Sequence, residues 1–204
     1  MCDSKNRPWG ARRRKGGLKT LMKTLILDGN PSETDDNYNL YLAKISEHLR
    51  KKGHTVRTLT LREMSIRFCT GCWSCWWATP GECVFKDESH TVCREYINSD
   101  FVLFASPMIM GFASALIKKT QDKLIPLVHP YIDFVQGECH HRKRYDVYPK
   151  LGLLLEKTSG TDEEDIEITV DMFKRFALNL RSELALAALM TQSAQEVSDA
   201  IDGI

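Results

Sequence analysis

The segment TLILDGNPS, residues 24–32, decides the fold class of this 204-residue chain. Its first half is an apolar run, and the run ends in turn-forming Gly29, Asn30 and Pro31, as a buried strand entering a loop does. From Asn37 the apolar spacing changes to that of an amphipathic helix, which Gly53 ends. The segment is therefore the first strand and loop of a strand–loop–helix unit.

The alternation of strands and helices continues along the chain. Further apolar runs predict strands at 55–61, 101–105, 151–155 and 184–190. The last of these runs would also suit a helix, because it is rich in alanine. Helical spacing predicts helices at 37–52, 87–99, 113–127, 166–180 and 193–201. Residues 129–149 read as a long polar insertion. This order predicts an α/β fold with a doubly wound, five-stranded parallel sheet covered by helices on both faces.

Composition and charge limit the class of protein. The chain is 43% hydrophobic and 27% charged, as ordinary globular proteins are, and it has no run of 18 apolar residues that could cross a membrane. Residues 1–23 hold eight Lys or Arg and one Asp. We therefore interpret residues 1–21 as a basic, flexible extension, and 22–204 as a single domain. Nucleic-acid binding by the extension is a less favoured alternative.

The loop at residues 29–37 should lie at the ligand-binding edge of such a sheet, beyond the carboxyl ends of the strands. It lacks the glycine pattern of dinucleotide-binding folds and the Lys of a P-loop. Its hydroxyls, amide side chain and backbone N–H groups at a helix N-terminus suit a single phosphate. The alternative is that the loop only caps the helix, since Asp35 and Asp36 would repel an anion.

The loop after the third strand is the second candidate surface. Pro107 and Gly111 fix an irregular backbone there, and small residues open the next helix. A flat aromatic ring could lie against such a surface. The alternative is that Met108 and Met110 fill the core, as methionines commonly do.

Four of the seven cysteines, Cys69, Cys72, Cys75 and Cys83, lie within 15 residues. Such clustering indicates a metal or redox site in a reducing compartment, so we expect a cytoplasmic protein. The spacing suits a [4Fe–4S] cluster, whereas structural zinc sites more often use two separated Cys pairs. The third alternative is a metal-free loop, which we prefer because the gap before Cys83 is bulky and stiff.

Cys139, His140 and His141 form a smaller group inside the insertion. A metal site is one interpretation. We prefer a solvated or subunit-facing loop, because no acidic or cysteine partner lies at a convincing distance in the sequence.

Three motifs together resemble a known family. They are Gly29-Asn30-Pro31-Ser32 with Asn37, the four cysteines, and Ser106-Pro107 followed by Gly111 and Ser114 to Lys118. This combination resembles the flavodoxin-like NAD(P)H-dependent FMN reductases, and within them the iron–sulfur flavoproteins and relatives with the same cysteine loop. The resemblance covers residues 22–127.

The resemblance implies a flavin site. The FMN phosphate would be held by Asn30, Ser32 and Asn37. The remaining cofactor-binding residues would line the flavin ring: Ser106, Pro107, Met108, Ile109, Met110, Gly111 and Phe112. Where the family usually has Tyr, this chain has Ile109, which puts in doubt a ring contact and any proton-relay role of the Tyr hydroxyl.

The expected function is that of an FMN-dependent oxidoreductase. NAD(P)H would reduce the flavin, which would pass electrons to a quinone, a flavin or another small acceptor. Because the flavin carries the chemistry, no catalytic side chain is expected. The alternative is a non-enzymatic electron carrier between protein partners. Trp73, Trp76 and Trp77, together with the insertion, favour a homodimer or homotetramer.

Overall fold

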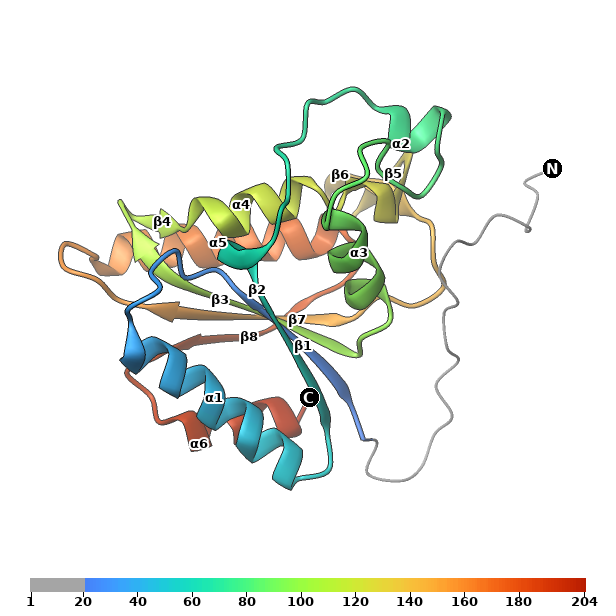
Figure 1. The fold of residues 1–204 in the computed structure, drawn as a ribbon. Coiled ribbons are helices and arrows are strands. Elements are labelled where there is room, and N and C mark those ends of the chain that lie inside the picture. The colour runs from blue at the N-terminus through green and yellow to red at the C-terminus, as the bar shows by residue number, and fades with distance from the viewer. Residues whose placement is uncertain (1–20) are drawn as a thin grey trace.

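A computed structural model describes residues 21–204 of the chain (Figure 1). Its centre is a sheet of five parallel strands in the order β2-β1-β3-β7-β8. In chain order they are β1 (Lys23–Asp28), β2 (Thr55–Thr60), β3 (Phe101–Ile109), β7 (Lys150–Glu156) and β8 (Leu184–Leu189). This order confirms the predicted doubly wound fold. The basic extension predicted before Met22 lies, apart from Leu21, outside the described residues.

The burial of the strands explains why they could be recognised as apolar runs. β1, β3 and β7 occupy the middle of the sheet and are buried over nearly their whole length. β2 is an edge strand in which buried and exposed residues are mixed. Strands covered on both sides need apolar residues on both faces, whereas edge strands tolerate polar ones.

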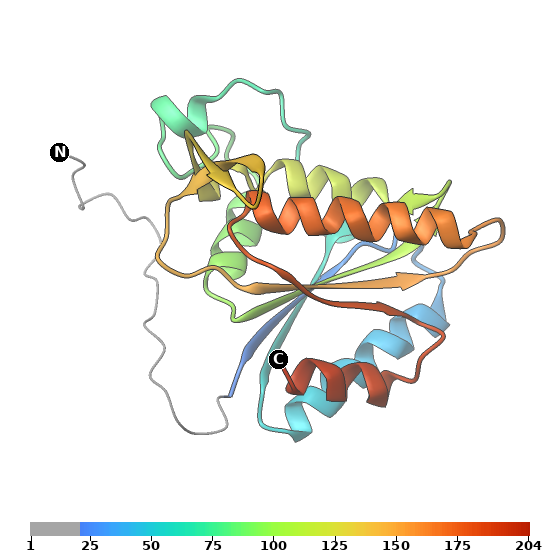
Figure 2. The same cartoon turned by 180° about the vertical axis from the view of Figure 1, so that it is seen from behind.

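Helices cover both faces of the sheet (Figure 1, Figure 2). α1 (Asp36–Lys51) and α6 (Ala194–Asp202) lie on one face. α3 (Ser89–Ile97), α4 (Ala115–Asp122) and α5 (Glu163–Asn179) lie on the other. Alternate side chains of β1 belong to two separate hydrophobic cores, one on each face, as this layering requires.

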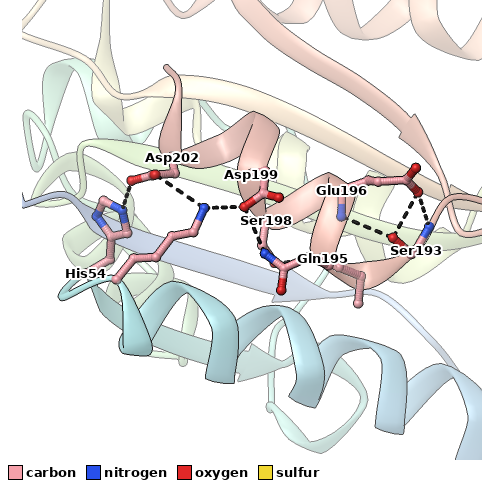
Figure 3. Close-up of polar contacts among 9 residues, drawn as sticks. His54, Ser193, Gln195, Glu196, Ser198, Asp199 and Asp202 are labelled. Carbon is pink, nitrogen blue, oxygen red and sulfur yellow. Dashed lines mark hydrogen bonds and ion pairs between the residues drawn. The ribbon is translucent and has the colours of Figure 1, made fainter.

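A polar cluster fastens the chain near the start of β1 to the end of α6 (Figure 3). The backbone N–H of Met22 donates to Nδ1 of buried His54 at 3.1 Å, and His54 Nε2 lies 2.8 Å from Asp202 Oδ1. Lys52 forms ion pairs with Asp199 and Asp202. The sequence assigned no role to His54, and the structure gives it a structural one.

The helix expected at 113–127 is shorter than predicted. α4 ends at Asp122, and a separate 3-10 helix, η2 (Ile125–Leu127), follows it. Pro126 explains the break, because proline lacks the N–H that would donate to Asp122 O in a continuing α-helix.

The polar insertion expected at 129–149 contains regular structure that the sequence did not predict. β5 (Val128–Val135) and β6 (Glu138–Lys143) form an antiparallel hairpin. Gln136 and Gly137 make its turn with φ of 51° and 85°. Two consecutive positive φ angles are typical of the two-residue turns that match strand twist, and Asn-Gly usually supplies them. Here the pair is Gln136-Gly137, so the usual sequence signal of a hairpin turn is missing.

Two short helical turns complete the fold, η1 (Leu61–Glu63) after β2 and α2 (Ser74–Trp77) in the cysteine loop. Across residues 21–204, no helix combines the length and the apolar character needed to cross a bilayer.

Candidate functional site

The first loop leaves β1 at the carboxyl edge of the sheet and is held close to two neighbouring elements. The N–H of Gly29 donates to Ala105 O in β3 at 2.8 Å. A Cβ on Gly29 would lie 2.4 Å from Cγ1 of Ile117 in α4. Glycine is therefore needed here for close approach, because any side chain would push the loop and the helix apart.

Asn30 and Asp35 fix the loop from within. Asn30 is buried, its Oδ1 accepts from Ser32 N at 2.9 Å, and its Nδ2 donates to Asp35 Oδ2 at 3.4 Å. Asp35 is the N-cap of α1, and its Oδ1 accepts from Tyr38 N at 3.1 Å. The capping interpretation is thus confirmed for Asp35. Phosphate binding by this loop stays a prediction.

Small polar side chains remain at the mouth of the loop. Ser32 Oγ lies 3.4 Å from Thr34 Oγ1, and Asn37 is exposed in the first turn of α1. Thr34 was not among the predicted ligands. Together with the positive end of a 16-residue helix, these groups form a place where an anionic oxygen could receive several hydrogen bonds.

The segment predicted to line a ring is the tip of a hairpin. β3 runs on to Ile109, beyond the expected strand, and turns back into β4 (Phe112–Ala113). The turn residues Met110 and Gly111 have φ of 51° and 80°, again the pattern of a tight hairpin turn. Ile109, Met110 and Phe112 are exposed apolar residues, and Met110 is 93% exposed. The tip offers an apolar surface beside the first loop.

Buried polar contacts join this hairpin to the first loop. Ser106, Pro107 and Met108 are buried, so their side chains support the tip from behind. Ser106 Oγ accepts from Ser114 N at 2.8 Å, and Ser114 Oγ donates to Gly29 O at 2.5 Å. Ser114 is also the N-cap of α4. One serine thus holds β3, the first loop and α4 together.

Arg62 brings a positive charge to the same edge of the sheet. Its Nη1 donates to Asp28 Oδ2 at 3.1 Å and lies 3.4 Å from Asn30 O. Burial raises the pKa of Asp28, although the Asn30 N–H and the Arg62 guanidinium oppose the rise. The sequence reading missed Arg62. Its position just after the second strand, at the ligand-binding edge of the sheet, could have marked it as a candidate site residue.

A buried tyrosine hydroxyl lies beneath these loops. Tyr38 is 1% exposed, and its Oη has no hydrogen-bond partner among residues 21–204. Burial, followed by the charges of Asp28, Glu156 and Asp35, raises its pKa. Burial and the charge of Asp35 raise the pKa of Glu156 as well. Buried polar groups are rarely left unpaired, so the Tyr38 hydroxyl is a donor available to a ligand or a water.

The cysteine loop forms a second site. A cavity of about 290 Å³ lies between this loop and the C-terminal end of α4. Its lining includes all four cysteines of the motif, Cys69, Cys72, Cys75 and Cys83, with Lys123 at one side. The bulky gap before Cys83 therefore does not hold it away from the other three, contrary to the reason given for preferring a metal-free loop.

The four thiols interact electrostatically, but they are not arranged closely enough to bind one metal ion. Burial first, and then the neighbouring Cys83, Cys69 and Cys72, raise the pKa of Cys75 to about 11. Within residues 21–204, no three His, Cys, Asp or Glu side chains are grouped closely enough to hold one metal ion. A cubane cluster places one thiolate at each iron corner, so its ligands stand farther apart.

Trp73 lines the cysteine cavity, and Trp76 and Trp77 lie next to it in α2. Trp73 stacks on Trp76 with ring centroids 4.7 Å apart, and Trp76 Nε1 donates to Val128 O at 3.0 Å. Trp73 and Trp77 are exposed. Figure 1 shows α2 and β4 near opposite ends of α4. At 1.5 Å per residue, the eight residues of α4 span about 12 Å.

The group in the insertion is not a cluster of three ligands. Cys139 is exposed, whereas His140 is buried and its Nε2 lies 3.0 Å from Glu138 Oε2. His141 packs at 5.0 Å from the ring of Trp76. The His141–Trp76 contact packs the β5–β6 hairpin against α2, whereas the His140–Glu138 contact lies within β6.

Comparison with known proteins agrees with this geometry. The family described as having a flavodoxin-like fold matches residues 22–126, which is half of the chain, and the chain belongs to that family. An iron–sulfur flavoprotein of Archaeoglobus fulgidus is 28% identical over 102 residues, covering 50% of this chain and 48% of the relative. The chain thus spans about half the length of this curated relative.

Solved structures share the fold over most of the chain. An azoreductase from Bacillus anthracis superposes with a TM-score of 0.63 at 13% identity, covering 90% of this chain and 100% of its own. An NAD(P)H:quinone oxidoreductase from Methanothermobacter marburgensis gives a TM-score of 0.58 at 18% identity, covering 90% and 93%. At these identities the likeness establishes the fold.

Proposed function

We propose that this chain is an FMN-dependent oxidoreductase that takes electrons from NAD(P)H and passes them to a quinone, a flavin or another small acceptor. The observation that carries the proposal is the junction made by Ser114, which joins the loop after β1 to the hairpin after β3. In sheets of this strand order, FMN binds at the switch point between those two strands. A relative named as an iron–sulfur flavoprotein and a structural neighbour named as an NAD(P)H:quinone oxidoreductase support the same function.

The residues at this edge fit a flavin phosphate and ring. Ser32, Thr34 and Asn37 would bind the phosphate at the helix N-terminus, with Asn30 shaping the loop behind them. The exposed hairpin tip formed by Ile109, Met110, Gly111 and Phe112 would face the ring. FMN, when bound, supplies hydride acceptance from the nicotinamide and electron delivery to the acceptor. The protein's part is to bind the phosphate, orient the ring and limit access of water.

The assignment of the first loop to the FMN phosphate can be tested by adding negative charges to the loop. Ser32→Asp and Asn37→Asp each place a carboxylate beside the phosphate, so both should weaken FMN binding, measured by quenching of flavin fluorescence. Gln195→Asp adds the same charge to the first turn of α6 and serves as the matched control. Unchanged affinity in both loop variants would remove this loop from the site.

The cysteine cavity gives a second proposed element, a [4Fe–4S] cluster. All four thiols of the motif line one cavity, and thiolates are the ligands that such clusters require. This observation reverses the preference for a metal-free loop, which rested on the bulky and stiff gap before Cys83. Anaerobic reconstitution should yield about four iron and four sulfide per chain. Cys72→Ser should lose them and keep FMN, and a wild-type protein without iron would contradict the assignment.

We also propose a homodimer or larger assembly. Exposed apolar side chains occur at the cysteine loop, the β3–β4 tip and the β5–β6 hairpin, as Trp77, Met110 and Phe134 illustrate. Large exposed apolar groups are typical of interaction surfaces. Light scattering at micromolar concentration should give at least twice the chain mass with FMN bound, and a monomer would refute the proposal.

A rival function is a carrier that moves single electrons between proteins and does not bind nicotinamide. Reduction of bound FMN by NADH or NADPH without any other protein separates the two functions.

A further inference from the structure

Lys123 places a buried positive charge at the wall of the cysteine cavity. It is the C-cap residue of α4, and its side chain is 2% exposed. Its Nζ lies 3.0 Å from Cys83 Sγ and 3.1 Å from Asp87 Oδ2. Lysine is almost never buried this fully unless it is paired.

The ion pair with Asp87 does not by itself explain this placement. Asp87 already accepts hydrogen bonds from Ser89 N at 2.9 Å and Arg67 N at 3.1 Å. Lys123 therefore shares its charge between a well-satisfied carboxylate and one particular sulfur. That sulfur belongs to Cys83, the cysteine set apart from the other three in the sequence.

We infer that Lys123 is a positioning residue that orients Cys83 toward the cavity and raises the reduction potential of a cluster bound there. The inference rests on the proposed cluster. Reduction by one electron, supplied by the reduced flavin, adds one negative charge to the cluster and makes or breaks no bond. A fixed cation hydrogen-bonded to a ligand sulfur stabilises the more negative state, and both net charge and hydrogen bonds to sulfur set such potentials.

The size of the effect follows from the contact. A hydrogen bond to a charged group commonly changes an equilibrium constant by about tenfold or more. Loss of Lys123 should therefore lower the equilibrium constant for cluster reduction by about tenfold, which is a fall of about 59 mV for a one-electron couple. Removing the charge of Asp87 should move the potential the other way.

The test is a potentiometric titration of the reconstituted cluster, followed by electron paramagnetic resonance, in the full-length FMN-loaded protein. The variants are Lys123→Met, Lys123→Gln and Asp87→Asn. Lys118→Met removes the same charge from an exposed position on α4 and is the matched control. Lys123→Gln keeps a polar side chain of similar size, in case the Met variant assembles poorly.

The expected result is a more negative potential in both Lys123 variants, a more positive one in Asp87→Asn, and no change in Lys118→Met. Opposite shifts from the two partners of one ion pair would not arise from general damage to the loop. A wild-type potential in Lys123→Gln with a full cluster would overturn the inference and leave the proposed cluster standing. A wild-type protein that takes up no cluster would overturn both, and FMN binding would be unaffected by either result.

Discussion

Ser114→Ala would remove the hydrogen bond that joins the loop after β1 to the β3–β4 hairpin in the proposed flavin site. Ser114 Oγ caps α4 by accepting from Ile117 N and donates to the buried Gly29 O. Loss of an N-cap costs about 1 kcal/mol, and an unsatisfied buried carbonyl costs about 1–3 kcal/mol. We expect the free energy of unfolding to fall by about 2–4 kcal/mol, with weaker FMN binding, because the loop is no longer held against the hairpin.

The assay is urea unfolding of the FMN-free protein together with fluorescence titration of FMN. Ser193→Ala is the matched control, because Ser193 caps α6 in the same way but contacts neither loop. The control should lose about 1 kcal/mol and keep its FMN affinity. If Ser114→Ala costs no more than Ser193→Ala and binds FMN as tightly as the wild type, the reasoning about this junction is wrong.

Three further predictions concern packing and charge. Gly29→Ala should destabilise the fold by about 1–3 kcal/mol in urea unfolding and weaken FMN binding, because the added Cβ collides with Ile117. His54→Ala should cost about 1–3 kcal/mol with no change in FMN affinity, because it removes a buried imidazole and its contacts to Met22 N and Asp202 Oδ1, far from the loops. Burial alone would raise the pKa of Asp87, but hydrogen bonds from Ser89 and Arg67 lower it to about 2, below its ordinary 3.8. The contribution of the Asp87 carboxylate to the free energy of unfolding is therefore complete above about pH 4 and is lost as the pH falls towards 2. In Asp87→Asn the free energy of unfolding should depend less steeply on pH over this range.

The sheet could be predicted because its strands are buried on both faces. The runs in β1, β3 and β7 are continuous and apolar, and the turn residues after Asp28 mark where the first one ends. The β5–β6 hairpin was not predicted because both strands are partly exposed, because β6 is polar, and because Gln136 occupies a turn position where Asn is the usual signal.

The site could be predicted only where local sequence determines it. The first loop and the hairpin tip are contiguous segments, so the sequence could propose their residues as candidates. Arg62 was not, because its approach to Asn30 depends on the pairing of β2 with β1. The position of Cys83 depends on the path of the loop over the end of α4, and neither spacing nor composition specifies that path. Lys123 enters the cavity for the same reason.

The most direct test of the account is to mix FMN-loaded protein with NADH or NADPH in the absence of oxygen and follow flavin absorbance. The account predicts that at least one nucleotide bleaches the flavin rapidly and without another protein, and that a small quinone restores the colour. Bound FMN that neither nucleotide reduces, or a protein that binds no FMN, would contradict it.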